Sequence, residues 1–120
     1  MQEDDAVTLS KIQKDELDKN GFCILPGVLN QGRLNDTRTA LQRAIKKTKD
    51  RGIATHIPGL DPNEYNIRIF NLLDLDPLFV DLIADAEALS IVKDLIGNDF
   101  IVSNFTANIA KPGSGSMQIH

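Results

Sequence analysis

The order of helix-like and strand-like patterns is the feature that most constrains the fold of this chain. Helical patterns fill much of residues 10–51 and 76–96, whereas the longest strand-like run, residues 100–111, lies near the C-terminus. Helices and strands that are segregated along a chain, rather than alternating regularly, are typical of α+β proteins. We therefore predict a mixed α+β structure in which helices come first and the sheet begins only at the C-terminal end.

The N-terminal quarter predicts a short helix and a short strand. Residues 1–9 are expected to be frayed or disordered, and Ser10 can cap a helix that runs to Lys19 with Ile12 and Leu17 as its apolar positions. Asn20-Gly21 would end that helix because both residues tolerate a left-handed backbone. The apolar run Phe22–Leu25 predicts a strand that Pro26-Gly27 terminates.

Residues 30–51 form the longest helix candidate. One stripe of this segment is apolar, and the other face is basic. The stripe contains Leu34, Leu41, Ala44 and Ile45, accompanied by Thr37 and Thr48, and the basic cluster contains Arg43, Lys46, Lys47, Lys49 and Arg51. Such a cluster on a helix is typical of a solvated face.

The remaining segments predict a loop, two strands and two helices. Pro58, Gly59 and Pro62 make residues 53–63 a loop, and Tyr65–Leu73 is expected to be a strand. Asp76-Pro77 is a strong helix start, with Leu78, Phe79, Leu82 and Ile83 as the buried face. A second helix would carry Leu89, Val92, Leu95 and Ile96 and end before Gly97; Phe100–Lys111 is then a long strand, and Pro112-Gly113 turns it towards Met117–His120.

Composition narrows the possible partners and the compartment. The net charge of −4 gives no sign of a general affinity for nucleic acid or anionic membranes, and no apolar run is long enough to span a membrane. The single cysteine, Cys23, lies between apolar residues and is expected to be a buried thiol. The acidic N-terminus lacks the apolar region of a secretory signal, so we expect a cytoplasmic protein.

Polar side chains on the long strand are the first candidates for a site. Asn104, Thr106 and Asn108 alternate and would share one face, although strand interiors disfavour asparagine. The face could belong to an edge strand in water or could line a polar cavity, and the spacing does not choose between them. Arg68, between apolar residues, is expected to form a structural ion pair.

The two histidines, His56 and His120, do not make a site by themselves. His56 is expected to be polar surface in a loop, and no zinc spacing, phosphate loop or dinucleotide-binding glycine pattern is present. Gln118 and His120 alternate onto one face of the short strand after the Pro-Gly turn.

Four segments, taken in order, resemble the N-terminal half of the phytanoyl-CoA dioxygenase-like family. They are residues Leu17–Leu29 with their Gly-Phe step, Arg68–Leu73 running into Asp76–Phe79, Ile96–Phe100, and Ala110–Ser114 leading to Gln118–His120. The resemblance covers roughly residues 12–120. Members of this family are Fe(II)- and 2-oxoglutarate-dependent oxygenases on a double-stranded β-helix, a jelly-roll or cupin-like fold.

The resemblance implies a role for several side chains. His120 matches the first iron ligand of a His-x-Asp pair, and the other ligands and the arginine for 2-oxoglutarate would lie beyond the end of the chain. Asn104, Thr106 and Asn108 match a strand that helps to hold 2-oxoglutarate, Gln118 is a further cofactor contact, and Asn71 matches a substrate-facing position. Members often carry glutamine three residues before the ligand histidine, where this chain has Met117.

We therefore expect residues 10–120 to be the N-terminal part of a truncated domain of this family. The parent would oxidise, most simply hydroxylate, a small organic or lipid-like substrate with Fe(II) and 2-oxoglutarate, and the 120 residues alone would be inactive. An apolar face with Ile101, Phe105 and Ile109 would be left uncovered. Two alternatives remain: a non-catalytic α+β interaction domain in which His120 is incidental, and a metal-free family member.

Overall fold

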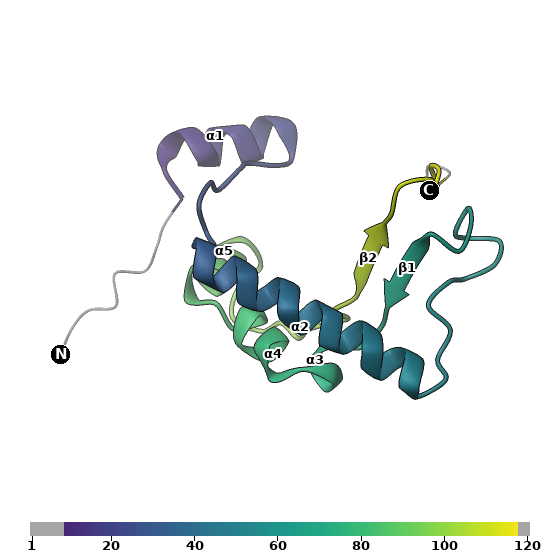
Figure 1. Ribbon diagram of the computed structural model, residues 1–120. Coiled ribbons are helices and arrows are strands. Elements are labelled where there is room, and N and C mark those ends of the chain that lie inside the picture. Colours follow the sequence, from purple (N-terminus) through teal and green to yellow (C-terminus); the bar gives the residue numbers. More distant parts are fainter. Residues whose placement is uncertain (1–8, 118–120) are drawn as a thin grey trace.

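The computed structural model describes residues 9–117 and combines five helices with a two-stranded sheet within that range. In chain order the elements are α1 (Lys11–Asn20), α2 (Gln31–Asp50), β1 (Asn66–Ile69), α3 (Leu72–Leu75), α4 (Pro77–Ile83), α5 (Ala86–Ile96) and β2 (Ala107–Ala110). Figure 1 shows the long helix α2 running beside the shorter helices, with the β1–β2 ribbon at its C-terminal half. Helices and strands are mixed, but β1 lies in the middle of the chain, ahead of α3, α4 and α5, so the prediction that the sheet begins only at the C-terminal end is wrong.

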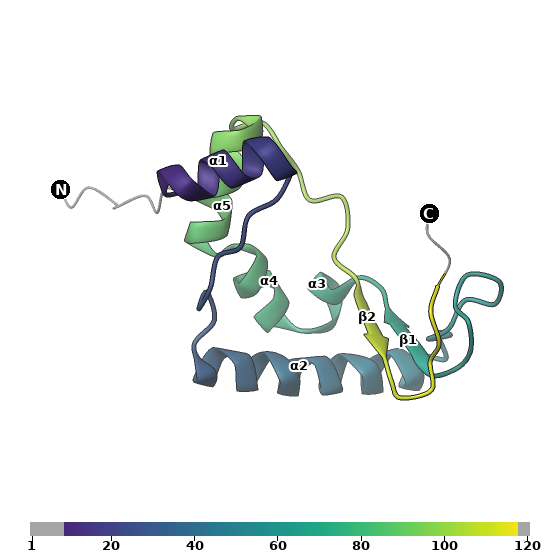
Figure 2. The same cartoon turned by 90° about the horizontal axis from the view of Figure 1, so that it is seen from above.

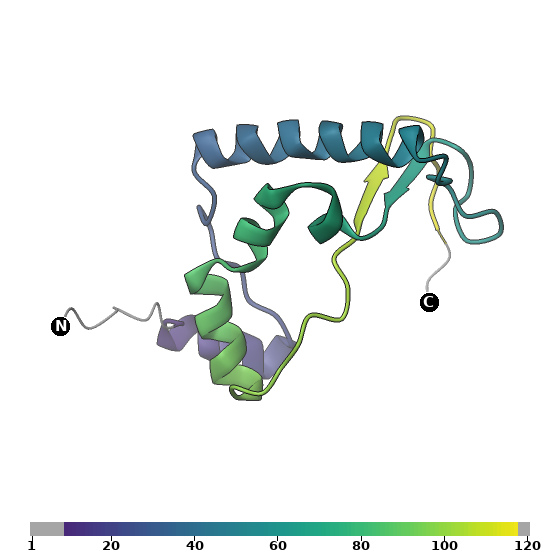
Figure 3. The ribbon, with the colours of Figure 1, turned by 90° about the horizontal axis from the view of Figure 1, so that it is seen from below.

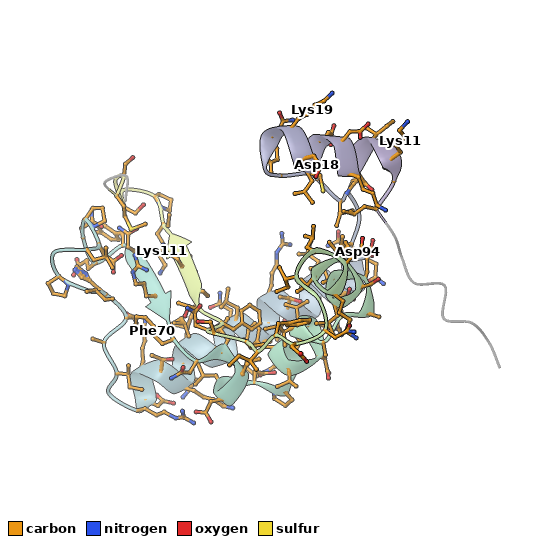
Figure 4. All side chains as sticks on the ribbon, turned by 180° about the vertical axis from the view of Figure 1, so that it is seen from behind. Lys11, Asp18, Lys19, Phe70, Asp94 and Lys111 are labelled. Atoms are coloured by element: carbon orange, nitrogen blue, oxygen red, sulfur yellow. The ribbon has the colours of Figure 1, made fainter. Side chains whose placement is uncertain are left out.

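Helix α1 begins and ends where its capping residues predict. The Ser10 side chain accepts a hydrogen bond from the Gln13 backbone, and the Gln13 side chain accepts one from the Ser10 backbone. Gly21 ends the helix with a left-handed backbone. Its apolar position Ile12 is 71% exposed, and α1 stands apart from the other helices (Figures 1 and 4).

Residues 22–25 do not form the predicted strand. A strand needs a neighbour to take up its backbone hydrogen bonds, and the only sheet in the described residues pairs β1 with β2. Phe22 and Ile24 are 61% and 70% exposed, and Cys23 between them is half-buried rather than enclosed. The prediction of a buried thiol is therefore wrong.

Helix α2 supports the core with small residues. Asn30 caps it by accepting a hydrogen bond from the Arg33 backbone, and its buried residues are Ala40, Ala44 and Thr48. The same core contains Ile67, Ile69, Leu72, Leu75 and Phe79, and Leu41 and Ile45 pack against it. The predicted apolar stripe of α2 is thus confirmed from Leu41 onward, and Figure 2 shows α3 and α4 lying beside this helix.

The basic face of α2 is exposed to solvent, as the charge pattern predicts, and three of its side chains also bind the α3–α4 corner. Arg43 Nε lies 2.7 Å from Asp76 Oδ2, Lys47 Nζ donates to the Leu75 carbonyl, and Arg51 pairs with Asp74. Of the other cations, Lys46 pairs with Asp50 one turn later and stays exposed. Three basic side chains therefore fasten α2 to the α3–α4 corner, yet all three stay exposed to solvent, so the predicted solvated face is confirmed.

The β1–β2 ribbon is antiparallel and shorter than either predicted strand. Its register places Asn66 opposite Ala110, Ile67 opposite Ile109, Arg68 opposite Asn108, and Ile69 opposite Ala107. Asn71 turns into the left-handed region with φ 56°, which ends β1 and starts α3. Residues 100–106 have no strand partner in residues 9–117, so the predicted strand Phe100–Lys111 is reduced to its last third.

Helix α4 begins and helix α5 ends where the sequence predicts. Asp76 accepts a hydrogen bond from the Leu78 backbone ahead of Pro77, and Asp85 caps α5 in the same way, with Gly97 at the end. In Figure 3, α4 lies next to α2, whereas α5 extends away from it. Helix α5 accordingly has no buried residue.

The predicted uncovered apolar face is only partly present. Ile101 is 92% exposed, as expected. Phe105 and Ile109 instead pack against the core, and the Phe105 ring meets Phe79 edge-to-face with centroids 5.8 Å apart. The expectation is therefore confirmed for Ile101 and wrong for the other two.

Candidate functional site

The polar face of the β1–β2 ribbon is the part of the structure where candidate residues gather. Residues directly opposite one another in an antiparallel pair share a face, so Arg68 and Asn108 lie side by side, with Asn66 and Ala110 next along the ribbon. Ile67, Ile69 and Ile109 occupy the other face, towards the core. Figure 4 marks the two ends of the ribbon by Phe70, just beyond β1, and Lys111, just beyond β2.

Arg68 is held on this face by a buried carboxylate. Its Nε lies 2.7 Å from Asp61 Oδ1, and the two side chains are 14% and 0% exposed. The second oxygen of Asp61 accepts a hydrogen bond from the Ile57 backbone at 2.8 Å. The predicted structural ion pair of Arg68 is thus confirmed, and its carboxylate partner comes from the loop that precedes β1.

The environment of Asp61 favours its charged form. Burial alone would raise the pKa of this carboxyl, but hydrogen bonds from the Ile57 backbone and from Arg68 outweigh burial and lower the pKa. The pair therefore stays ionised near neutral pH. Because Asp61 binds Nε of Arg68, the Nη atoms of the guanidinium can bind a different group.

The turn after β2 is attached to this face by three side chains. Asn63 Nδ2 donates to the Gly113 carbonyl and Asn66 Nδ2 donates to the Ser114 carbonyl, each at 2.9 Å. Arg68 Nη2 lies 3.0 Å from Met117 Sδ. Residues 111–117, which precede the predicted ligand His120 along the chain, are thereby held against the ribbon.

The other predicted site residues are dispersed. Asn108 lies in β2 and Thr106 just before it, whereas Asn104 lies outside any regular element; Asn104 and Asn108 are exposed and Thr106 is half-buried. Asn71 is exposed at the β1–α3 junction, and its side chain makes no capping hydrogen bond. Gln118 and His120, predicted to contact the cofactor and the metal, lie outside the described residues.

His56 differs from the polar surface residue that the loop composition predicts. It is half-buried, its Nδ1 is buried without a hydrogen-bond partner, and it is close enough to Asp61 to affect its pKa. Across residues 9–117 there is no group of three or more His, Cys, Asp or Glu side chains that could hold a metal ion. His56 therefore belongs to the polar cluster around Asp61, without a ligand set of its own.

Sequence reasoning missed Asp61, Asn63 and Asn66 as members of this site. All three are in or next to the loop of residues 53–63, and each also bonds a group 7 to 50 positions away along the chain. The one available signal was the number of polar residues that can make side-chain hydrogen bonds in a segment rich in turns. Such composition does not reveal which backbone groups they meet.

The chain is 39% identical over 104 residues to a protein named Dioxygenase af480 from Aspergillus fumigatus. The match covers 87% of this chain and 34% of the relative, so the chain spans about a third of the relative's length. No protein-family description and no solved structure matches the chain. Among residues 9–117, no helix is both long enough and apolar enough to cross a membrane.

Proposed function

We propose that this chain is the N-terminal part of a longer parent enzyme, a non-haem Fe(II)- and 2-oxoglutarate-dependent dioxygenase. The observation that carries the proposal is the identity of 39% to a protein named as a dioxygenase, spread over 104 residues rather than confined to one motif. The resemblance of four ordered segments to the phytanoyl-CoA dioxygenase-like family points to the same chemistry. The fold of the completed parent would be a double-stranded β-helix.

The proposed reaction inserts one oxygen atom of O₂ into a C–H bond of the substrate. The second oxygen atom enters 2-oxoglutarate, which loses CO₂ and becomes succinate, so the 2-oxoacid supplies the two electrons that hydroxylation by O₂ requires. Iron, when bound, would supply the site at which O₂ and the 2-oxoacid meet. The substrate would be a small organic or lipid-like molecule.

The described residues do not supply that iron site by themselves. Residues 9–117 hold no group of three metal-binding side chains, and the proposed ligand His120 lies beyond them. What this part of the chain offers is a rigid polar face, with Arg68 fixed by Asp61 and Asn108 directly opposite.

We propose Asn104, Thr106, Asn108 and Gln118 as contacts for 2-oxoglutarate and Asn71 as a substrate contact. Asn108 has the strongest support, because it lies on the same face as Arg68. Carboxamide and hydroxyl groups suit the carboxylate of a 2-oxoacid, since they can donate hydrogen bonds to its oxygens. The exposure of Asn104 and Asn108 leaves their side chains available to a ligand.

The test is succinate formation by the full-length parent with Fe(II), O₂ and 2-oxoglutarate. The proposal expects succinate to form and expects Asn108→Ala to raise the 2-oxoglutarate concentration needed for half-maximal rate. Gln42→Ala, an exposed change on α2, is the matched control and should leave that concentration unchanged. A parent that forms no succinate under these conditions contradicts the proposal.

One observation favours a second candidate, a non-catalytic α+β interaction domain. The row of polar residues predicted for a long strand is incomplete, because only Asn108 of the three lies in a strand. In such a domain the polar residues would simply face water at a sheet edge. Absence of both Fe(II) binding and 2-oxoglutarate binding in the parent would favour this candidate.

A further inference from the structure

We infer that Asn63, Asn66 and Arg68 are positioning residues that fix the backbone of residues 111–117, the segment that precedes the proposed iron ligand His120 in the sequence. The inference rests on the proposed function for its consequence, because His120 is there an iron ligand. Its structural part stands on contacts among described residues alone. We call these three side chains, together with Asp61, the turn clamp.

Two carboxamides of the clamp bind consecutive carbonyls of the same turn. Asn63 donates to Gly113 and Asn66 donates to Ser114, and these bonds link positions that are 50 and 48 residues apart in the chain. Ser114 N donates to the Lys111 carbonyl and closes the turn from within. Asn66 and Ser114 are both buried, so water cannot readily replace the bond between them.

Arg68 extends the clamp to the end of the described turn. Asp61 fixes one side of the guanidinium at 2.7 Å, and the other side reaches Met117 Sδ, 49 residues further along the chain. The planar fork of arginine can face two partners at once, whereas the single ammonium of lysine cannot reproduce that geometry. Asp61 is itself oriented by the Ile57 backbone, so the loop before β1 supports the whole arrangement.

Residues 111–117 form more long-range side-chain contacts than a turn needs in order to reverse the chain after β2. The β1–β2 ribbon itself is held by its ladder and by the hydrogen bond from Lys111 N to the Tyr65 carbonyl. The clamp adds restraint beyond the ladder, on the three residues Gly113, Ser114 and Met117. A metal ligand that follows such a turn gains affinity when its approach is fixed beforehand, because less freedom is lost on binding.

The experiment uses the full-length parent and two readouts. Hydrogen exchange at the amides of residues 111–117 reports the clamp directly, and the affinity for Co(II), with its visible absorption, reports the proposed metal site. We expect Asn66→Ala to speed exchange at these amides by about tenfold, as loss of one buried hydrogen bond does. We expect its Co(II) affinity to fall by about tenfold or more, the range seen when residues supporting a metal ligand are removed.

Three further variants make the result specific. Arg68→Lys keeps the charge but not the fork and should speed exchange near Met117, whereas Arg51→Ala, which removes the exposed pair with Asp74, should change neither readout. Asn63→Ala, in an exposed contact, reports the clamp if the Asn66 variant fails to fold.

The outcomes separate the inference from the proposed function. Unchanged exchange at residues 111–117 in the Asn63, Asn66 and Arg68 variants overturns the clamp. Faster exchange with unchanged Co(II) affinity retains the clamp as a structural device and overturns its role in placing His120. A wild-type parent that binds no Co(II), but whose variants exchange faster, contradicts the proposed function and leaves the structural part supported.

Discussion

Asn71 illustrates how one backbone conformation ends a strand. Its φ of 56° lies in the left-handed region, where asparagine is tolerated better than most residues, and α3 begins at the next position. Asparagine is common in turns, but the alternating pattern through Tyr65–Leu73 predicted a continuous strand across this position. When a residue is compatible with both a strand and a left-handed turn, its surroundings determine which backbone conformation it adopts. Here the hydrogen bond from Leu72 N to the Phe105 carbonyl favours the turn.

The backbone of Asn71 gives a test that separates its structural and its proposed functional role. Asn71→Gly should leave the free energy of unfolding of the parent unchanged or slightly higher, because glycine enters the left-handed region freely. Asn71→Val should lower it by about 1–2 kcal/mol. Urea denaturation measures both. If the glycine variant keeps its stability but raises the KM for substrate, the carboxamide contacts substrate; an unchanged KM contradicts that role.

The buried carboxylates Asp61 and Asp76 make stability depend on pH. The Arg43 hydrogen bond lowers the pKa of Asp76 despite burial, and hydrogen bonds lower that of Asp61. A carboxyl whose folded pKa lies below its unfolded pKa stabilises the fold above the unfolded value and loses that effect as pH falls through the folded value. We therefore expect the free energy of unfolding to decrease below about pH 4, the ordinary range of aspartate.

Urea denaturation of the parent between pH 3 and pH 7 measures this dependence. Asp76→Asn should flatten the acid limb, because it removes one of the two depressed groups. Asp50→Asn is the matched control, since its pair with Lys46 is exposed. An acid limb that is equally steep in the Asp76 variant would show that this carboxylate does not carry the predicted effect.

At the scale of elements, helix ends could be predicted from the sequence and strand lengths could not. Ser10, Asn30 and Asp76 each cap a helix through a backbone group two or three positions away, so the required information is local. A strand needs a partner that is distant in the sequence. The length of β2 is therefore limited to the four residues that pair with β1. The failed prediction for Phe22–Leu25 has the same cause. The clamp residues were likewise unpredictable, because Asp61, Asn63 and Asn66 act on groups brought near only by folding.

Close packing of α2 on the core gives a second stability test. Ala40 and Ala44 are fully buried, so a larger side chain there must displace its neighbours. Ala44→Leu should lower the free energy of unfolding of the parent by about 1–3 kcal/mol. Gln42→Leu, on the exposed side of the same helix, should change it by less than about 0.5 kcal/mol. Equal effects of the two changes in denaturation experiments would contradict the described core.

Across the whole molecule, apolar side chains are unevenly covered. The core beneath α2 is closed, but Ile24, Ile96 and Ile101 are 70%, 66% and 92% exposed. Exposed apolar surface promotes association. We expect the 120-residue chain, prepared alone, to self-associate in sedimentation experiments, and Ile101→Lys with Ile96→Lys to reduce that association. A monomeric, cooperatively melting chain would favour the interaction-domain candidate.

The central claim is that the full-length parent binds Fe(II) through His120 and then binds 2-oxoglutarate. The most direct measurement is anaerobic Fe(II) binding to the wild-type parent, to His120→Ala, and to His56→Ala as the matched control at the only other histidine of this chain. We predict stoichiometric binding by the wild type and by the His56 variant, with binding at least about tenfold weaker in the His120 variant. Equal Fe(II) affinity in all three proteins would contradict the account.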